Sequence, residues 1–448
     1  MTKKSSLLLF SASIFTSSLL VSQPILAQSI SEAVAQTIQS NPTILAESNS
    51  RLSADQRITQ ARAGYYPTVD FGIGTGWETT DNPSTRAAGK GHHESMNRDE
   101  ANIAIRQMLY DGFATKNAVD QSESLSESAG YSVADTAETT SLRAVEVYLD
   151  VLRREELLGA TEKNLESHER IYGQISQRVD SGVGTRADAE QTQGRLALAK
   201  SNLESNIGNL QDAKSSFLRV VGNEPESLTD PSQECCDKAP ANIEDALKTA
   251  QHQHPALRSA IAEHEASLAQ AKGAEAPFHP RLDLEIDATA NNNIDGQKGH
   301  NKDILAMARM RYNLLNGGAD KARIGQTEFL SEQAKAEAEI AKRQIENDVR
   351  LAWSALESST SRLQYLEQHV KASEDTRDAY QEQFNVGLRS LLDLLDTENE
   401  VLTARINYIN AYYDRIYSCY WLSESTGKLL EHLELAAPAE AMTVASPQ

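Results

Sequence analysis

The stretch that decides the fold is Gly387-Leu-Arg-Ser-Leu-Leu-Asp-Leu-Leu-Asp-Thr-Glu-Asn399. A long helical pattern ends at its glycine, and a second helical pattern begins with Asp393 and Asp396 three residues apart. Because residues i and i+3 share a helix face, the two carboxylates lie one above the other. In a monomer the two carboxylates would be ordinary solvent-exposed groups. In a symmetric oligomer the copies of each carboxylate would form a ring of acids. The stretch therefore predicts a hairpin tip that belongs to an oligomer.

The same plan occurs twice in the chain. Ile30 and its neighbours recur at Ile243, an offset of 243 − 30 = 213, and Gly182 recurs at Gly387, an offset of 387 − 182 = 205. An internal duplication of this length predicts two structural repeats with one architecture. The predicted boundaries are a first repeat at 28–222, a linker at 223–242 and a second repeat at 243–430. Each repeat reads as helix, β-hairpin, long helix, tip and helix, with hairpins at 66–110 and 280–315 and tips at 180–186 and 385–389.

Both predicted β-hairpins alternate apolar with polar residues. Acids and arginines fall on one face, and Trp77 and Tyr312 fall on the other. This arrangement is typical of strands with water on one side and lipid on the other. The loops at 79–98 and 291–303 would then face outward. Four strands cannot close a barrel and lipid does not tolerate open sheet edges, so we expect three copies to share one barrel of twelve strands.

The two long helical patterns run without proline from about Phe113 to Val179 and from about Ala319 to Phe384. Roughly 65 residues at about 1.5 Å each give helices about 100 Å long. In the second helix, apolar residues keep a heptad spacing that is firmest from Val349 to Val370, which favours packing against neighbouring helices. The predicted fold is therefore mainly α: long antiparallel helical hairpins that form a coiled-coil tunnel below a membrane β-barrel portion, in a trimer.

The ends and the charge of the chain limit its location and partners. Residues 1–27 read as a signal peptide, with Lys3 and Lys4 before an apolar run and Ala27 before the expected cleavage. The net charge of −21 argues against a nucleic-acid partner. The tail at 431–448 is expected to be disordered. No function is predicted for Cys235, Cys236 or Cys419.

These features together resemble the TolC family of outer-membrane channels. The most specific motif is Gly387-x-x-Ser390-x-x-Asp393-x-x-Asp396, with a partial copy at Gly182-x-x-Thr185-x-x-Asp188 and turns at Asp111-Gly112 and Asn316-Gly317-Gly318. The resemblance implies a homotrimer in the outer membrane, in contact with its lipid and extending into the periplasm. It also implies docking with a periplasmic adaptor protein and an inner-membrane ABC or other transporter.

The resemblance further implies roles for the tip residues. Asp393 and Asp396 would form the acidic ring of the periplasmic gate, and Arg389 with Asp188 would act as a latch between neighbouring hairpins. Gly182, Thr185, Gly387 and Ser390 would shape the tips on which the adaptor docks. Where the family often has a tyrosine before the glycine, this chain has Phe384, which loses one closing hydroxyl.

Three functions remain open at this point. The run Leu391–Glu400 looks most like the type I protein secretion branch, as in exporters of a large adhesin or toxin, and a multidrug efflux component is the alternative. A periplasmic coiled-coil adaptor without a barrel is a more remote one. An enzyme is not expected: His92, His93, His252 and His254 lack the spacing of a zinc site, and no nucleotide or nucleophile motif is present. We expect no cofactor and no metal.

Overall fold

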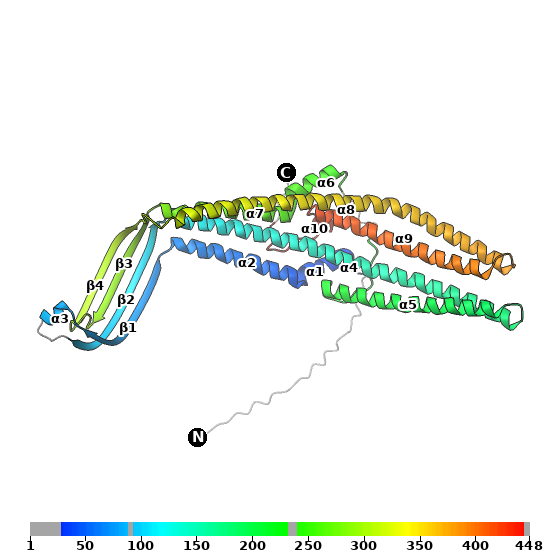
Figure 1. Ribbon diagram of the computed structural model, residues 1–448, viewed down its shortest axis with the longest axis horizontal. Coiled ribbons are helices and arrows are strands. Elements are labelled where there is room, and N and C mark those ends of the chain that lie inside the picture. Colours follow the sequence, from blue (N-terminus) through cyan, green and yellow to red (C-terminus); the bar gives the residue numbers. More distant parts are fainter. Residues whose placement is uncertain (1–27, 88–92, 232–239, 443–448) are drawn as a thin grey trace, which may run out of the picture.

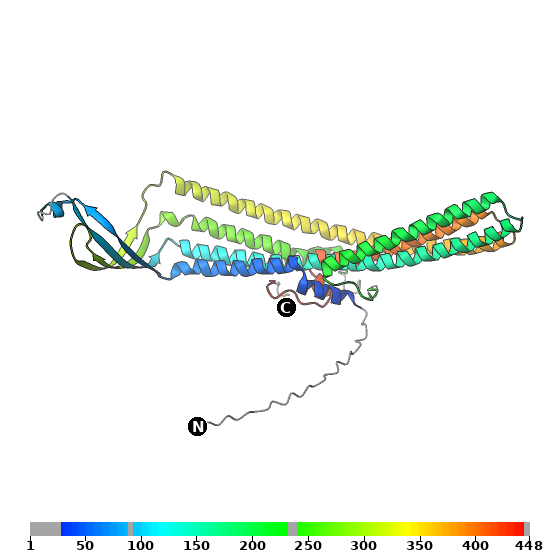
Figure 2. The same ribbon diagram turned by 90° about the horizontal axis from the view of Figure 1, so that it is seen from below.

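The computed structural model describes residues 28–87, 93–231 and 240–442. The molecule is elongated, with a β-sheet at one end and two helical hairpin tips side by side at the other (Figures 1 and 2). The predicted signal peptide at 1–27 lies outside the described residues.

Two very long helices run along the whole helical part. Helix α4 (Ala114–Asp180) and helix α8 (Ala319–Asn385) have 67 residues each, and their starts differ by 319 − 114 = 205. At about 1.5 Å per residue each is about 100 Å long. A short turn connects α4 to α5 (Arg186–Val221), and a second one connects α8 to α9 (Leu391–Ser425), which gives two antiparallel hairpins.

Shorter helices connect these hairpins to the rest of the chain. They are α1 (Ile30–Ser40), α2 (Pro42–Arg62), α6 (Ile243–Gln253) and α7 (Pro255–Gly273), with single turns η1 (Ala63–Tyr65) and η2 (Ala276–Phe278), α3 (Pro83–Ala87) and α10 (Leu429–His432). Helices α2 and α7 both begin with proline, where no N–H is needed. Asn41 and His254 cap them by accepting from the amides of Thr43 and Ala256. None of the helices in the described ranges has the length and apolar character needed to cross a lipid bilayer.

The sheet joins the two halves of the chain. Strands β1 (Thr68–Thr80), β2 (Glu94–Tyr110), β3 (Arg281–Asn292) and β4 (His300–Arg311) pair antiparallel in the order β1-β2-β3-β4. Strands β2 and β4 begin inside the regions predicted as the outward loops 79–98 and 291–303, because polar pairs such as Thr79 with Ser95 continue the ladder beyond the apolar zone. The connection between β3 and β4 is therefore only residues 293–299.

The register gives the sheet one apolar and one polar face. Val69, Ile105, Ile286 and Ala306 lie in one row across all four strands. On this face Ile73 is 80% and Trp77 is 73% exposed within the chain. Exposed apolar side chains in a continuous sheet face indicate contact with lipid or another apolar surface. The predicted assignment of Trp77 to this face agrees with the strand parity, whereas Tyr312 lies one residue beyond the end of β4.

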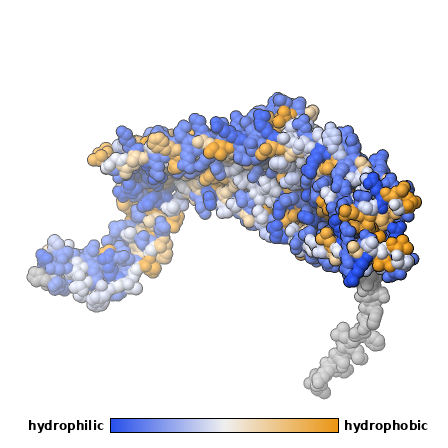
Figure 3. Space-filling model, turned by 45° about the vertical axis from the view of Figure 1, so that its right-hand side comes forward, coloured by the Kyte–Doolittle hydropathy of each residue, from blue (hydrophilic) through white to orange (hydrophobic). Residues whose placement is uncertain are grey.

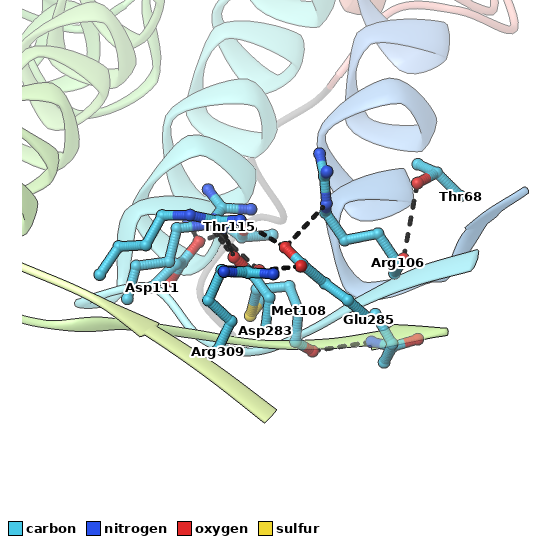
Figure 4. Close-up of polar contacts among 11 residues, drawn as sticks. Thr68, Arg106, Met108, Asp111, Thr115, Asp283, Glu285 and Arg309 are labelled. Atoms are coloured by element: carbon cyan, nitrogen blue, oxygen red, sulfur yellow. Dashed lines mark hydrogen bonds and ion pairs between the residues drawn. The ribbon is translucent and has the colours of Figure 1, made fainter. Parts of the chain in front are cut away.

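The polar face carries a cluster of acids and arginines close to the helices (Figure 4). Asp283 is fully buried and accepts from Arg281 Nε at 3.0 Å and from Arg311 Nη1 at 2.8 Å. Glu285 accepts from Arg309 Nε at 2.6 Å and also from Arg311. Ion pairs of this kind satisfy the buried carboxylates and tie β3 to β4.

The strands meet the long helices at turns with left-handed backbone, which glycine occupies at three positions and Phe113, with φ +67°, at a fourth. Gly112 has φ +70° before α4, and Gly317 and Gly318 have φ +56° and +87° before α8. Backbone in this region is strained for other residues. Beside the first turn, Asp111 Oδ2 accepts from the Thr115 amide at 2.9 Å and so satisfies one free donor of the α4 N-terminus (Figure 4).

The main core lies at the waist of the molecule, where α1, α4, α5, α9 and α10 meet around Tyr148, Phe217 and Tyr420. The C-terminal segment is part of it. Leu433 is buried, Leu435 packs on the core, and the Met442 amide donates to Gly130 O at 3.0 Å. The prediction of a disordered tail at 431–448 is therefore wrong for residues 431–442, because their apolar side chains have a core to cover; residues 443–448 lie outside the described residues.

One cysteine has a structural role that the sequence did not predict. Cys419 of α9 is fully buried and disulfide-bonded. Cys235 and Cys236 lie outside the described residues.

Candidate functional site: the two hairpin tips

The two tips have the same backbone. Gly182 and Gly387 both have φ +78°, and in each tip an amide after the glycine bonds back to the last turn of the long helix. The Val183 amide donates to Arg178 O at 3.0 Å, and the Leu388 amide donates to Gln383 O at 2.9 Å. This pattern is the glycine-terminated helix end with a 6→1 bond. Glycine ends each long helix sharply, and the chain reverses within a few residues.

A capping box restarts the helix on the far side of each tip. Thr185 Oγ1 accepts from the Asp188 amide at 3.2 Å, and Ser390 Oγ accepts from the Asp393 amide at 3.2 Å. Each aspartate returns a bond to the cap residue, whose amide lies 3.3 Å from Asp188 Oδ2 in the first tip and 3.3 Å from Asp393 Oδ2 in the second. Such boxes satisfy two free donors of a helix N-terminus. Asp188 and Asp393 thus have a structural role that the sequence analysis did not assign.

The capping box also affects the charge of Asp393. Hydrogen bonds from the Ser390 hydroxyl and amide, with the nearby Arg389 guanidinium, lower the pKa of the Asp393 carboxyl below its ordinary value. Within one chain Asp393 is therefore a carboxylate at neutral pH. It supplies fixed negative charge at the second tip.

Asp396 lies one turn further along α9 and contacts the other hairpin. Arg195 Nη2 of α5 is 3.3 Å from Asp396 Oδ1, and the Asp396 side chain is 60% exposed. Asp393 and Asp396 are thus on the same helix, but only Asp396 joins the two hairpins of one chain. Arg195 is a partner that the sequence analysis missed, because its spacing from the tip carries no motif.

Arg389 and Asp188 do not contact each other within the chain. The Arg389 guanidinium lies 4.0 Å from the centre of the Tyr380 ring, and its Nε donates to Gln383 Oε1 at 3.0 Å. Both partners belong to its own hairpin, as does Asp393 at 3.8 Å. A link between Arg389 and Asp188 could therefore form only between different chains, and it stays a prediction.

Phe384, which stands where the family often has a tyrosine, joins the two hairpins of one chain. It is 5% exposed, and the Arg178 guanidinium of α4 lies 4.9 Å from its ring centre. A cation over an aromatic face is attracted by the ring quadrupole. Phe384 is also part of a small apolar core between the hairpins, with Ile171, Ile175, Leu391, Leu394 and Leu395. The two hairpins of one chain are thus joined by packing as well as by charge.

A second polar contact between the hairpins lies above the tips. Arg170 of α4 donates to Gln381 Oε1 of α8 at 3.1 Å and lies 3.9 Å from Glu398 Oε1 of α9. Glu398 is 2% exposed, and burial raises the pKa of its carboxyl above the ordinary value. Its position two residues after Asp396 gave no signal in the sequence.

The outer surface of the tips is partly apolar. Val183, Val386 and Leu388 are 81%, 71% and 77% exposed. Figure 3 shows apolar patches among hydrophilic surface at the end of the molecule that carries the tips. Exposed apolar patches on a polar surface are typical of protein contacts. In the described part of the chain, no group of three His, Cys, Asp or Glu side chains is placed to hold a metal ion.

Known proteins resemble this chain over most of its length. The family model described as outer membrane efflux protein matches residues 33–223 and 246–428, once in each half. The outer membrane efflux protein BepC of Brucella suis is 24% identical over 94% of this chain and 90% of its own length. The outer membrane protein TolC of Vibrio cholerae is 24% identical over 92% of this chain and 93% of its own length.

Two further similarities bear on fold and function. The solved structure of CusC, described in terms of folding and transmembrane channel formation, covers 89% of this chain and 92% of that one with a TM-score of 0.78 at 15% identity. The proteases secretion protein PrtF of Dickeya chrysanthemi is 20% identical over 92% of this chain and 91% of its own length. The remote alternative of an adaptor without a barrel does not agree with these matches. The chain belongs to the outer membrane efflux protein family and is a TolC-like channel protein of the outer membrane that extends into the periplasm.

Proposed function

We propose that this chain forms the homotrimeric exit duct of a type I protein secretion system, docked on a periplasmic adaptor and an inner-membrane transporter. The observation that carries the proposal is the acidic, partly apolar tip of two hairpins whose long helices extend about 100 Å, at the end of the molecule opposite the sheet. The sheet supports an assembly of several copies: β1 and β4 are its two outer strands, and lipid does not tolerate unpaired strand edges. Three copies would give a barrel of twelve strands.

Fewer observations support secretion over efflux than support an exit duct in general. It comes from the run Leu391–Glu400 and from relatives such as PrtF that are named for protease secretion. BepC, named as an efflux protein, supports the multidrug efflux alternative. Deleting the gene separates the two. Secretion predicts that one or a few large proteins disappear from the culture medium while drug susceptibility is unchanged; a drug-hypersensitive strain with an unchanged set of secreted proteins contradicts it.

The gate is proposed to be a ring of Asp393 and Asp396 carboxylates from three chains. Like charges that converge raise one another's pKa, so the ring should titrate as a coupled set and bind multivalent cations. We expect Asp393→Ala with Asp396→Ala to abolish block by trivalent cations in planar bilayers and to weaken cation selectivity. The control is Asp180→Ala with Glu190→Ala, which removes two exposed acids from the first tip. Unchanged block in the first double variant excludes these acids from the gate.

The latch is proposed to be Arg389 of one chain with Asp188 of its neighbour. Breaking three such links should favour untwisting of the hairpins, so Arg389→Ser should raise single-channel conductance. Arg186→Ser is a suitable control, because the Arg186 side chain is 91% exposed and pairs only along its own helix with Glu190. Conductance at the wild-type level for Arg389→Ser contradicts the latch.

A further inference from the structure

The waist of the molecule holds a group of carboxylates that the tip mechanism does not use. Glu138 of α4 is 7% exposed and accepts hydrogen bonds from the amides of Leu429 at 2.8 Å and Leu430 at 3.4 Å. These amides begin α10, the start of the C-terminal segment Leu429–Met442. A side chain of the first half of the chain therefore holds the last segment of the second half.

Two more acids lie around Glu138. Asp135 is one turn earlier on α4, and Glu424 is near the end of α9; both are half-buried. Burial, with smaller contributions from the nearby Glu424 and Asp135, raises the pKa of the Glu138 carboxyl to about 8, although its two amide bonds oppose the shift. Burial also raises the pKa of Glu424 to about 7 and that of Asp135 to about 6.

The other charged groups at this site do not neutralise the cluster. From α7, His254 is 3.9 Å from Asp135, but burial lowers the pKa of its imidazole to about 4, so it is neutral. Asp348 of α8 adds negative charge, which raises the pKa of Glu424 and opposes the lowering of the His254 pKa. Just before the C-terminal segment, Lys428 lines the same cavity of about 260 Å³ as Glu138, but its Nζ pairs with Glu431 at 3.2 Å.

The C-terminal segment covers this site. Leu429 is fully buried, Leu433 is 7% exposed, and the Met442 amide bonds to Gly130 O on α4. Together these contacts leave Glu138 only 7% exposed. A buried carboxylate without a compensating cation is costly, and lifting the segment hydrates it.

We propose that Glu138 is a pH-sensitive lock that holds the segment Leu429–Met442 on α4 when it is protonated and weakens that contact when it is ionised. The uncharged carboxyl still accepts from the α10 amides, and ionisation adds repulsion from Asp135 and Glu424. The lock sets how firmly α4 of the first half is joined to α9 and α10 of the second. It is independent of the proposed function.

The direction of the pH effect follows from the raised pKa of Glu138. The docked pKa is about 8 against an ordinary value of 4.5, so docking is strongest below the ordinary value and weakens as the pH rises toward 8. Above that pH the carboxyl is ionised in both states and the effect levels off. Between the two values the docking equilibrium falls by about tenfold per pH unit if Glu138 acts alone.

Hydrogen–deuterium exchange of the full-length protein, purified in detergent, tests the lock. We expect the protection of amides in 429–442, corrected for the chemical exchange rate, to fall at least about tenfold between pH 6 and pH 8. Glu138→Gln keeps an acceptor but cannot ionise, so its protection should lose most of the pH dependence and keep only the part that comes from Glu424 and Asp135. The control Glu440→Gln lies in the same segment but does not line the cavity that Glu138 lines, and should keep the wild-type response.

Two results would overturn the lock: equal protection of the wild type at both pH values, or a wild-type pH response in Glu138→Gln. If Glu138→Gln does not assemble, Glu424→Gln provides the second test. Removing that negative neighbour should lower the pKa of Glu138 and shift the midpoint of the response to lower pH. An unshifted midpoint contradicts the proposed cluster.

Discussion

The two hairpin tips share a turn but differ in what holds the helix that follows. Both have glycine at φ +78° and a capping box closed by an aspartate. At the three equivalent positions after the cap, however, the first tip has Arg186, Ala189 and Glu190, whereas the second has Leu391, Leu394 and Leu395. The three leucines are buried in the core between the hairpins. A short polar motif thus sets the turn, and the packing behind it decides how firmly the tip is anchored.

The largest expected difference is at Leu394, which is fully buried. Leu394→Ala should reduce the local opening free energy at the start of α9 by about 2–5 kcal/mol, because it removes buried apolar groups and leaves a cavity. Ala189→Gly at the equivalent position of α5 should cost about 1 kcal/mol, mainly through helix propensity. Hydrogen–deuterium exchange of the tip amides measures both changes. Equal losses in the two tips would show that packing does not distinguish them.

Much of this comparison could be predicted from the sequence. The offset of 205 identified both tips, and the glycine, Ser or Thr, and Asp spacing marked where each second helix begins. Alternation identified the four strands, since each has one apolar face. Local patterns of this kind depend on residues close together in the chain, so they remain readable without a structure.

Contacts between distant segments could not be predicted in this way. The pairing of β2 with β3 joins the two halves, but no local pattern gives its register. Arg170 and Glu398 are 398 − 170 = 228 residues apart in sequence, and only the packing of α4 on α9 buries Glu398. The sequence alone predicts disorder for the C-terminal segment, because its apolar residues Leu433 and Leu435 become informative only when the waist core is known.

Replacing the glycine of either tip should have a smaller effect on stability, of equal size in the two tips. Gly182→Ala and Gly387→Ala each place a side chain at φ +78°, where the added Cβ meets no other atom within 4 Å. The cost is therefore backbone strain alone, about 1–2 kcal/mol for each. Gly173→Ala, inside α4 and equally open, is the control and should instead be stabilising by about 1 kcal/mol. Hydrogen–deuterium exchange protection of the adjacent cap amides measures the stability change of all three variants.

Costs that differ strongly between Gly182→Ala and Gly387→Ala would mean that the tips do not share one backbone in the assembled protein. Such a result would point to a contact from another chain at one tip only.

The smallest expected effect belongs to the ion pair that crosses between the hairpins. Arg195 and Asp396 lie 3.3 Å apart with side chains 34% and 60% exposed, and exposed pairs contribute only about 0.2–1 kcal/mol. Asp396→Asn should therefore barely change exchange protection at the second tip, and added salt should reduce even that difference because it screens exposed charges. Arg195→Gln should match it, and a double-mutant cycle of the two isolates the pair energy. Since the first tip has Gln191 at the position of Asp396, a coupling well above this range would mean that charge, as well as the leucine core, anchors the second tip.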